Sequence, residues 1–389
     1  MKKILFLTID FPPMGGGMAR HSHDIGIALR RMGADYTVIA PSTARVSERD
    51  DGEGITVYRL KGVADTRIFD NYLKSVFAFF FRGLRHCLSG GVGLIIVNTW
   101  SIAGVAAFLI KKITGVPYVV FAHGLDVYAP RTIPKALWLM KLVLKNASVV
   151  AANSGFTKTL VEKVEPRAKA LVIHPAADPW RFAPDIPRKP KVCEGVKVIL
   201  TVGRLVGCKN HETVIRAMPE VVRIYPDTVY LIIGEGPEEK ALEDLALALG
   251  LEDKVVFLSG VKDSELAAYY RSCDIFVLAS KEVSGQGLVE GFGIVFLEAG
   301  LCAKPVIGGR SGGIPDAVLD GVTGILVDPT DKAAIASAII RLLSDRKLAR
   351  EMGENGKRRV ESEFNIDAFG RKLKNVFIRI SSAGSLFDD

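Results

Sequence analysis

Residues 274–299 read DIFVLASKEVSGQGLVEGFGIVFLEA, and this stretch shows how the rest of the chain is organised. Residues 274–278 are apolar apart from Asp274, which predicts a buried strand. A loop rich in glycine and charge follows over residues 281–293, and residues 294–299 predict the start of a helix. A strand, a loop and a helix in this order form the repeating unit of parallel sheets.

The same unit recurs in both halves of the sequence. Runs of Val, Ile and Leu alternate with amphipathic stretches, which predicts α/β architecture with two doubly wound parallel sheets, each covered by helices on both faces. One hydrophobic core organises at most about 250–300 residues, so 389 residues favour two domains. The predicted strands are 4–7, 36–39, 94–97, 118–121, 148–151 and 170–173, then 197–201, 229–233, 255–258, 274–278, 305–307 and 324–327; predicted helices include 20–31, 102–113, 134–145, 212–224, 238–249 and 294–299.

A proline-rich segment divides the sequence. Residues 178–191 carry four prolines among charged residues, which is typical of a linker. We therefore expect a first domain over residues 1–182, a second over 183–365, and a tail over 366–389 that contains a helix over 366–380. Ligands of open α/β sheets bind at the carboxyl ends of the strands, so two such domains facing each other would hold a ligand in the cleft between them.

Two stretches resemble targeting or membrane segments. The apolar run after Lys2 and Lys3 ends at Asp10, and two prolines follow, so a first buried strand is favoured over a signal peptide. Residues 89–110 carry no charge, but the polar segment 98–101 divides them into a strand and a helix, with a membrane-spanning helix as the weaker alternative. Without a targeting signal, the expected location is the cytoplasm. Five cysteines without a C-x-x-C pair exclude a disulfide framework and a standard zinc site.

The net charge of +8 is unevenly distributed. Residues 1–185 hold 24 Lys and Arg against 14 Asp and Glu, whereas the remainder holds 27 against 29. The first half also contains two stretches that mix aromatic and basic residues, 74–85 and 135–145. Each is typical of an ordinary core helix with solvated edges, but together with the charge they favour peripheral contact with an anionic membrane. The sequence has no nucleic-acid recognition motif, so a nucleic-acid partner is not expected.

Glycines follow the first predicted strand. Gly15, Gly16 and Gly17 precede a helix, where backbone N–H groups can approach an anion. The dinucleotide fingerprint requires Gly or Ala where Arg20 stands, and the second strand lacks the acidic residue that would bind a ribose, which argues against an NAD enzyme. No P-loop motif occurs. The alternative is a tight turn without a ligand.

The second half of the sequence also carries candidate ligand-binding residues, here cations and carboxylates, in loops between a strand and a helix. Arg204 and Lys209 lie between a strand and a helix, a combination that suits a diphosphate, with two solvated surface cations as the alternative. Glu290 precedes the predicted helix N-terminus and Glu298 lies one turn inside it. Eight helical residues span about 12 Å, so the two carboxylates could accept hydrogen bonds from hydroxyls at the two ends of a ligand. For Glu298 the alternative is an ion pair with a neighbouring helix.

These motifs in this order resemble the retaining GT-B glycosyltransferases of family 4. The resemblance covers essentially the whole chain, and the segment 285–298 is most similar to the phosphatidylinositol mannosyltransferase branch. It implies the GT-B fold, with the C-terminal helix returning to the first domain. The matching motifs are Gly15–Gly17, AHGLD at 122–126, NS at 153–154, IHPAAD at 173–178, Gly203-Arg204-Leu205 with Lys209, Glu290 with Glu298, SGGIPD at 311–316 and GVTG at 321–324.

The resemblance also implies a role for each matching residue. Arg204 and Lys209 would hold the donor diphosphate, Glu290 would bind the transferred sugar, and Glu298 the ribose. Gly16 and Gly17 would offer backbone N–H groups to the phosphate. His123 would contact the sugar from the first domain, with Asp126 close by. The base would lie near Val261 and Lys262, and the backbone of Phe292, Gly293, Ile294 and Val295 would assist Glu290. Asn210 departs from the family pattern, which has Gly after the Lys, and so does Ala176.

The implied activity is transfer of a hexose, with mannose from GDP-mannose favoured, to a lipid-linked or glycan acceptor. The sequence has no Asp-x-Asp motif, consistent with an enzyme that needs no metal and no cofactor besides its nucleotide-sugar substrate. Other interpretations are a UDP-sugar-dependent transferase, a sugar-nucleotide epimerase or phosphorylase of the same fold, and a non-catalytic nucleotide-sugar binder. The acceptor-binding loops would be residues 45–67 and 128–134.

Overall fold

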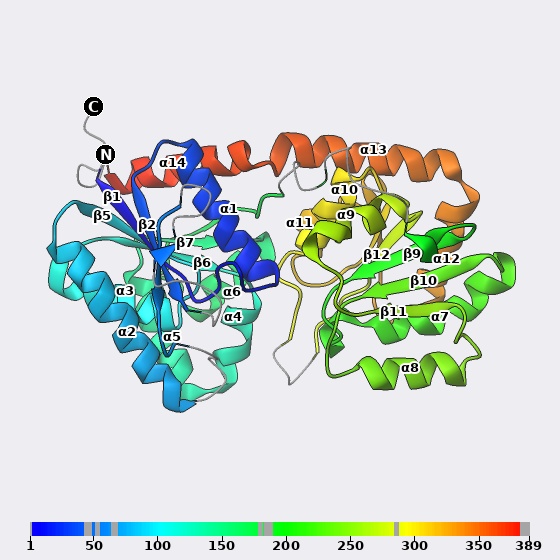
Figure 1. Ribbon diagram of the computed structural model, residues 1–389, viewed down its shortest axis with the longest axis horizontal. Coiled ribbons are helices and arrows are strands. Elements are labelled where there is room, and N and C mark those ends of the chain that lie inside the picture. Colours follow the sequence, from blue (N-terminus) through cyan, green and yellow to red (C-terminus); the bar gives the residue numbers. More distant parts are fainter. Residues whose placement is uncertain are drawn as a thin grey trace. The chain divides into compact units, whose positions relative to one another are not determined.

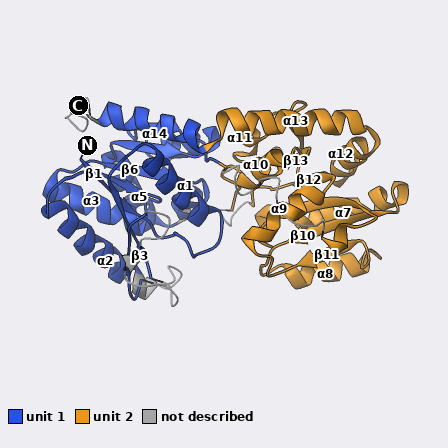
Figure 2. Cartoon of the chain, turned by 45° about the horizontal axis from the view of Figure 1, so that its top comes forward, with its two compact units in different colours: residues 1–176, 366–389 blue, residues 177–365 orange. Residues whose placement is uncertain are grey.

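All twelve strands expected from the sequence are present in the computed structural model, which describes residues 2–42, 49–50, 55–63, 69–177, 182, 190–283 and 288–381 (Figure 1). The chain divides into two units (Figure 2). Unit 1 comprises residues 1–176 and 366–389, and unit 2 comprises residues 177–365. Most of the predicted linker 178–191 and of the predicted acceptor loop 45–67 lies outside the described residues, as do residues 285–287 of the segment 285–298.

Unit 1 is built on a sheet in the order β3-β4-β2-β1-β5-β6-β7-β8, parallel except for the β3–β4 pair. Strands β3 and β4 were not expected from the sequence, because β3 has two residues and β4 is buried on one face only, so neither gives a continuous apolar run. The strands are β1 (Lys3–Leu7), β2 (Tyr36–Pro41), β3 (Arg49–Asp50), β4 (Val57–Leu60), β5 (Val92–Val97), β6 (Tyr118–Ala122), β7 (Val149–Ala152) and β8 (Ala170–Val172).

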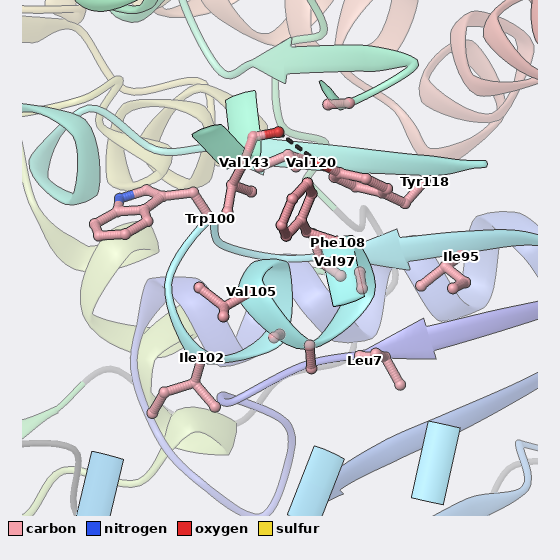
Figure 3. Packing of buried hydrophobic residues seen from close by; sticks show 14 of the residues in the cluster. Leu7, Ile95, Val97, Trp100, Ile102, Val105, Phe108, Tyr118, Val120 and Val143 are labelled. Carbon is pink, nitrogen blue, oxygen red and sulfur yellow. Dashed lines mark hydrogen bonds between the residues drawn. The ribbon is translucent and has the colours of Figure 1, made fainter. Parts of the chain in front are cut away.

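Helices cover both faces of this sheet. The core under α2, α3 and α5 includes Phe108 and Tyr118, whose hydroxyl donates to the carbonyl of Val143 at 2.5 Å (Figure 3). On the opposite face α14 packs along α1 and buries Phe369, so the C-terminal helix returns to the first unit as expected. The helices are α1 (Gly17–Arg31), α2 (Phe69–Leu88), α3 (Ile102–Thr114), α4 (Leu125–Tyr128), α5 (Pro134–Asn146), α6 (Gly155–Val164) and α14 (Ile366–Ser381).

Unit 2 is built on a parallel sheet in the order β11-β10-β9-β12-β13-β14. One core lies under α7, α8 and α12, and the other under α9, α10 and α13. The strands are β9 (Lys197–Val202), β10 (Thr228–Ile233), β11 (Val255–Leu258), β12 (Ile275–Leu278), β13 (Val306–Gly309) and β14 (Gly324–Val327). The helices are α7 (His211–Ile224), α8 (Glu239–Ala248), α9 (Asp263–Ser272), α10 (Ile294–Leu301), α11 (Ile314–Ala317), α12 (Lys332–Ser344) and α13 (Arg346–Glu363).

The uncharged stretch 89–110 forms β5 and most of α3, as expected, and the first apolar run forms the central strand β1. Within the described part of the chain, we find no helix with the length and apolar character needed to cross a bilayer.

Candidate functional site

The strand order of unit 2 defines one place where a ligand is expected. Connections run outward from β9 to one side and from β12 to the other, so the order reverses between these two neighbouring strands. Loops that leave such a switch point in opposite directions open a crevice at the carboxyl ends of the strands. The loop after β9 carries Arg204 and Lys209, and the loop after β12 leads to Glu290.

Lys209 and Glu290 meet across this switch point. The ammonium of Lys209 donates to Oε2 of Glu290, and the two side chains are 20% and 13% exposed. The thiol of Cys208 lies close enough to be influenced by the charges of both, although burial is the main reason that its pKa is raised. From the sequence, these two residues were expected to bind separate parts of a donor; the structure brings them into direct contact.

The glycine turn after β13 holds the backbone of Glu290. The N–H of Gly313 donates to the carbonyl of Glu290 at 2.9 Å. Gly312 has φ +55°, and a Cβ on it would lie 2.2 Å from the same carbonyl oxygen. Any residue larger than Gly at position 312 would displace the loop. This turn of the SGGIPD motif therefore fixes the position of the Glu290 backbone.

The structure shows why Asn210 can stand after Lys209, where the family pattern has Gly. It has φ 58°, a left-handed conformation that Asn tolerates better than most residues other than Gly. Its buried amide donates to the carbonyls of Ala279 (2.9 Å) and Pro329 (2.6 Å), and its Oδ1 accepts from Thr213 at 2.7 Å. Asn210 therefore supplies the turn that Gly would supply and also ties together the loops after β9, β12 and β14.

His211 follows Asn210 and is buried at the start of α7. Its Nε2 lies 3.2 Å from the carbonyl of Arg204. Burial lowers the pKa of His211 to about 4, and the neighbouring charge of Lys209 acts in the same direction. His211 is therefore neutral near pH 7 and adds no cation to the site.

A second glycine loop, residues 234–236 after β10, was not singled out from the sequence. A Cβ on Gly234 would lie 1.9 Å from the carbonyl oxygen of Gly203, and one on Gly236 would lie 2.3 Å from that of Leu205. The N–H of Leu205 also donates to the carbonyl of Glu235 at 2.9 Å. This loop supports the backbone around Arg204; two glycines directly after a predicted strand were the signal that could have revealed it.

The N-terminus of α10 lies directly after Glu290. Gly293 is its N-cap, without a side-chain cap, and the first turn carries no acidic residue that would offset the partial positive charge of this helix end. Phe292 is buried and its ring contacts Phe364, so its side chain is not free to bind a ligand, and a role for its backbone stays a prediction. Ile294 and Val295 are half-buried in the first turn.

Glu298 lies deeper in α10 and is 2% exposed. Its Oε2 accepts from the hydroxyl of Tyr270 at 2.7 Å.

Three other predicted residues are more accessible than Glu298. Arg204 and Lys262 are exposed, and Val261 is half-buried beside the edge strand β11. Two roles stay predictions: Glu298 is expected to bind the ribose, and Val261 and Lys262 are expected to bind the base.

Unit 1 has its own switch point, between β1 and β5. His123, which follows β6, lies beside it, and its Nε2 is 2.8 Å from the carbonyl of Asn98. A carbonyl oxygen can only accept, so Nε2 of His123 carries a hydrogen and donates it to Asn98. The ring also lies edge-on to buried His21 at a centroid distance of 5.3 Å. Burial, and secondly the charge of His123, hold the pKa of His21 well below its usual value.

Asp126 holds the backbone of His123. Its Oδ1 accepts from the N–H of His123 at 2.8 Å, and burial raises the pKa of the Asp126 carboxyl. This arrangement gives Asp126 a place beside His123 and a part in orienting it, whereas contact of either residue with a sugar stays a prediction.

Gly16 and Gly17 are exposed at the N-terminus of α1, where the first turn carries no acidic residue. Their surroundings leave room for an anion, since a Cβ on either would have no neighbour within 4 Å. Among the residues that the structure describes, no group of three or more His, Cys, Asp or Glu side chains is placed to hold a metal ion.

Two family models match consecutive parts of the chain. The one described as "Glycosyl transferase 4-like domain" matches residues 16–176, and the one described as "Glycosyl transferases group 1" matches residues 183–359. The GDP-mannose-dependent alpha-(1-6)-phosphatidylinositol monomannoside mannosyltransferase of Mycolicibacterium smegmatis is 33% identical over 362 residues. That alignment covers 91% of this chain and 92% of the relative.

Solved structures share the fold. A sucrose-phosphate synthase from Thermosynechococcus elongatus superposes with a TM-score of 0.83 at 24% identity, covering 99% of this chain and all of that one. Anabaena HepE in complex with UDP superposes with a TM-score of 0.79 at 21% identity, covering 97% of this chain and all of that one.

Proposed function

Because this chain belongs to the group 1 glycosyl transferases and has their GT-B fold, we propose that it transfers mannose from GDP-mannose to a lipid-linked or glycan acceptor. The observation that carries the proposal is the contact between Lys209 and Glu290 at the switch point of unit 2. Through this contact, a cation that suits a diphosphate and a carboxylate that suits a sugar hydroxyl lie side by side near the N-terminus of α10. The mycobacterial relative, whose name gives GDP-mannose as its donor, supports the choice of donor.

The arrangement suits stabilisation of a departing diphosphate. As the bond between the anomeric carbon and the phosphate oxygen breaks, negative charge develops on the diphosphate. Arg204, Lys209 and the α10 N-terminus would oppose it, and preorganised charges of this kind usually contribute more to catalysis than any other effect. Lys209 has three N–H donors, so it can bind a phosphate oxygen while still orienting Glu290 toward the sugar.

The proposed reaction proceeds with retention and without a metal, as the family resemblance implies. The acceptor oxygen attacks the anomeric carbon from the face that the diphosphate leaves, a new C–O bond replaces the old one, and the acceptor proton passes to the departing phosphate. His123, whose Nε2 is held by the carbonyl of Asn98, would contact the transferred sugar.

A panel of nucleotides tests the choice of donor. GDP and GDP-mannose are expected to raise the melting temperature more than UDP, ADP or their sugars, because a ligand that binds only the folded state stabilises it more the tighter it binds. Incubation with GDP-mannose alone should then release mannose and GDP slowly. A larger shift with UDP would overturn the donor assignment, epimerised nucleotide sugar would indicate an epimerase, and binding without any release or transfer would indicate a pure binder.

We further propose that unit 1 contacts an anionic membrane at the cytoplasmic side through the outer surface of α2, α3 and α5, which we call the apolar-basic face. These helices carry eight Lys and Arg and one acidic residue. Large apolar side chains point away from the core on all three: Leu73 (63% exposed), Phe77 (51%) and Phe81 (63%) on α2, Ile113 (59%) on α3, and Trp138 (66%) on α5. Exposed aromatic residues within a basic surround suit the interface of anionic lipids.

Replacing Phe77 and Phe81 together with Ser is expected to lower binding to vesicles about tenfold or more, since each Phe would lose the burial of its ring in the lipid interface. The measurement is sedimentation with phosphatidylcholine vesicles with and without about 30% phosphatidylglycerol. Leu247→Ser, at a residue 64% exposed on α8 of unit 2, is the matched control. Equal binding of the double variant and the unchanged protein would contradict the assignment of this face.

A further inference from the structure

One buried contact holds Glu298, the carboxylate that is predicted to bind the donor ribose. The hydroxyl of Tyr270, on α9, donates to Oε2 of Glu298, on α10, at 2.7 Å. Tyr270 is fully buried and Glu298 is 2% exposed. A carboxylate taken out of water needs hydrogen-bond donors to offset the lost hydration, and Tyr270 supplies one directly.

The ring of Tyr270 is held on two sides. Its centroid lies 5.8 Å from that of Phe182, at an edge-on angle of 74°, and 5.6 Å from that of Phe276 on β12. A ring packed in this way has little rotational freedom, so the direction of its hydroxyl is set before any ligand arrives. The position of the Glu298 carboxylate is set with it.

The same helix begins at the predicted base site. Lys262 is the N-cap of α9, and its N–H donates to Oε2 of Glu265 at 3.0 Å, which fixes the start of the helix. Tyr270 lies just over two turns further on, about 12 Å along the axis. Through Tyr270, α9 therefore connects the loop expected at the base with the carboxylate expected at the ribose.

We infer that Tyr270 is a positioning residue for nucleotide recognition: it orients Glu298 so that the carboxylate accepts hydrogen bonds from the ribose hydroxyls of the donor. This inference rests on the proposed nucleotide-sugar function and on the predicted binding of the donor ribose by Glu298. A carboxylate has about four acceptor sites, so Oε2 can hold the Tyr270 hydroxyl without using up the acceptor capacity of Glu298.

The test compares two ligands that differ only in the ribose. Affinities for GDP and for 2′,3′-dideoxy-GDP are measured by calorimetry on the full chain and on Tyr270→Phe, which keeps the ring and removes the hydroxyl. We expect Tyr270→Phe to lower the affinity for GDP about tenfold, the scale of a hydrogen bond to a charged group, and to change that for the dideoxy nucleotide less than about twofold. The preference for GDP over the dideoxy nucleotide should fall accordingly.

The preference is the ratio of the affinities of one variant for GDP and for the dideoxy nucleotide. A smaller folded fraction would lower both affinities by the same factor, so the ratio would not change. Tyr269→Phe is the matched control, because it removes the same atom from the adjacent, half-buried residue of α9. It is expected to leave the preference unchanged. Equal losses for both ligands in Tyr270→Phe would mean a purely structural role and would overturn the inference.

Glu298→Gln separates this inference from the proposed function. If Glu298→Gln loses the preference for GDP and Tyr270→Phe also loses it, the inference stands. If only Glu298→Gln loses it, Tyr270 does not position the carboxylate and the inference alone fails. If Glu298→Gln keeps the full preference, Glu298 does not bind the ribose, and both the proposed role and the inference that depends on it fail.

Discussion

Glu290→Ala is expected to lower turnover at least about 10²-fold while changing the affinity for GDP less than about threefold. Loss of one group that stabilises only the transition state has effects of this size. Glu290 is expected to contact the transferred sugar, which GDP lacks. Loss of the Glu290 side chain should therefore hardly change the affinity for GDP. Its backbone carbonyl is held by the N–H of Gly313, a contact that truncation of the side chain does not remove, so the loop should stay in place.

The measurement is transfer from GDP-mannose at saturating donor, together with GDP binding by calorimetry. Glu282→Ala, at an exposed position in the same loop, is the matched control and should keep near-normal turnover. Glu290→Gln tests whether the charge matters, because it keeps the length and the hydrogen-bonding oxygen. Unchanged turnover in Glu290→Ala would contradict the assignment of this residue.

Lys209→Ala is expected to weaken GDP binding about 10- to 100-fold, since a hydrogen bond to a charged group contributes about 1.5–3 kcal/mol. The loss should be smaller for GMP and absent for guanosine, because Lys209 is expected to contact the diphosphate. Calorimetry with the three ligands gives this series directly. Lys240→Ala is the control, because Lys240 pairs with exposed Asp244 on α8, outside the predicted site.

The Lys209→Ala/Glu290→Ala double variant tests whether Lys209 binds the diphosphate or only pairs with Glu290. In Lys209→Ala alone, Glu290 keeps a half-buried charge without its cation, and this charge would repel the diphosphate. The double variant removes that repulsion, so we expect GDP affinity to recover only in part. Full recovery to the level of the unchanged protein would show that Lys209 serves only to neutralise Glu290, and would contradict its role at the diphosphate.

The sequence by itself predicted most of the fold. Strands buried on both faces give continuous apolar runs, and helices give a period near 3.6, so each element can be recognised within about ten residues of sequence. Strand β9 (Lys197–Val202) and helix α14 (Ile366–Ser381) each agree with the predicted ranges, 197–201 and 366–380, to within a residue. Strands β3 and β4 could not be recognised in this way, because a short or one-sided strand leaves no such signal.

The candidate site was predicted only as separate residues. Glycines before helices, Arg204 with Lys209, and Glu290 with Glu298 each have a local physical meaning, and the family resemblance joined them. Their contacts could not be derived. Lys209 and Glu290 are 81 residues apart, and Asn210 reaches Pro329 across 119.

Tertiary structure decided which of these residues meet. The strand order of unit 2 brings the loops after β9 and β12 together at the switch point, while helix packing turns Glu298 toward Tyr270. Local sequence encodes burial and periodicity, because these depend on neighbouring residues. Contacts between loops depend instead on the order in which distant strands pair, so the sequence determined the elements and the type of chemistry, and the sheet determined the partners.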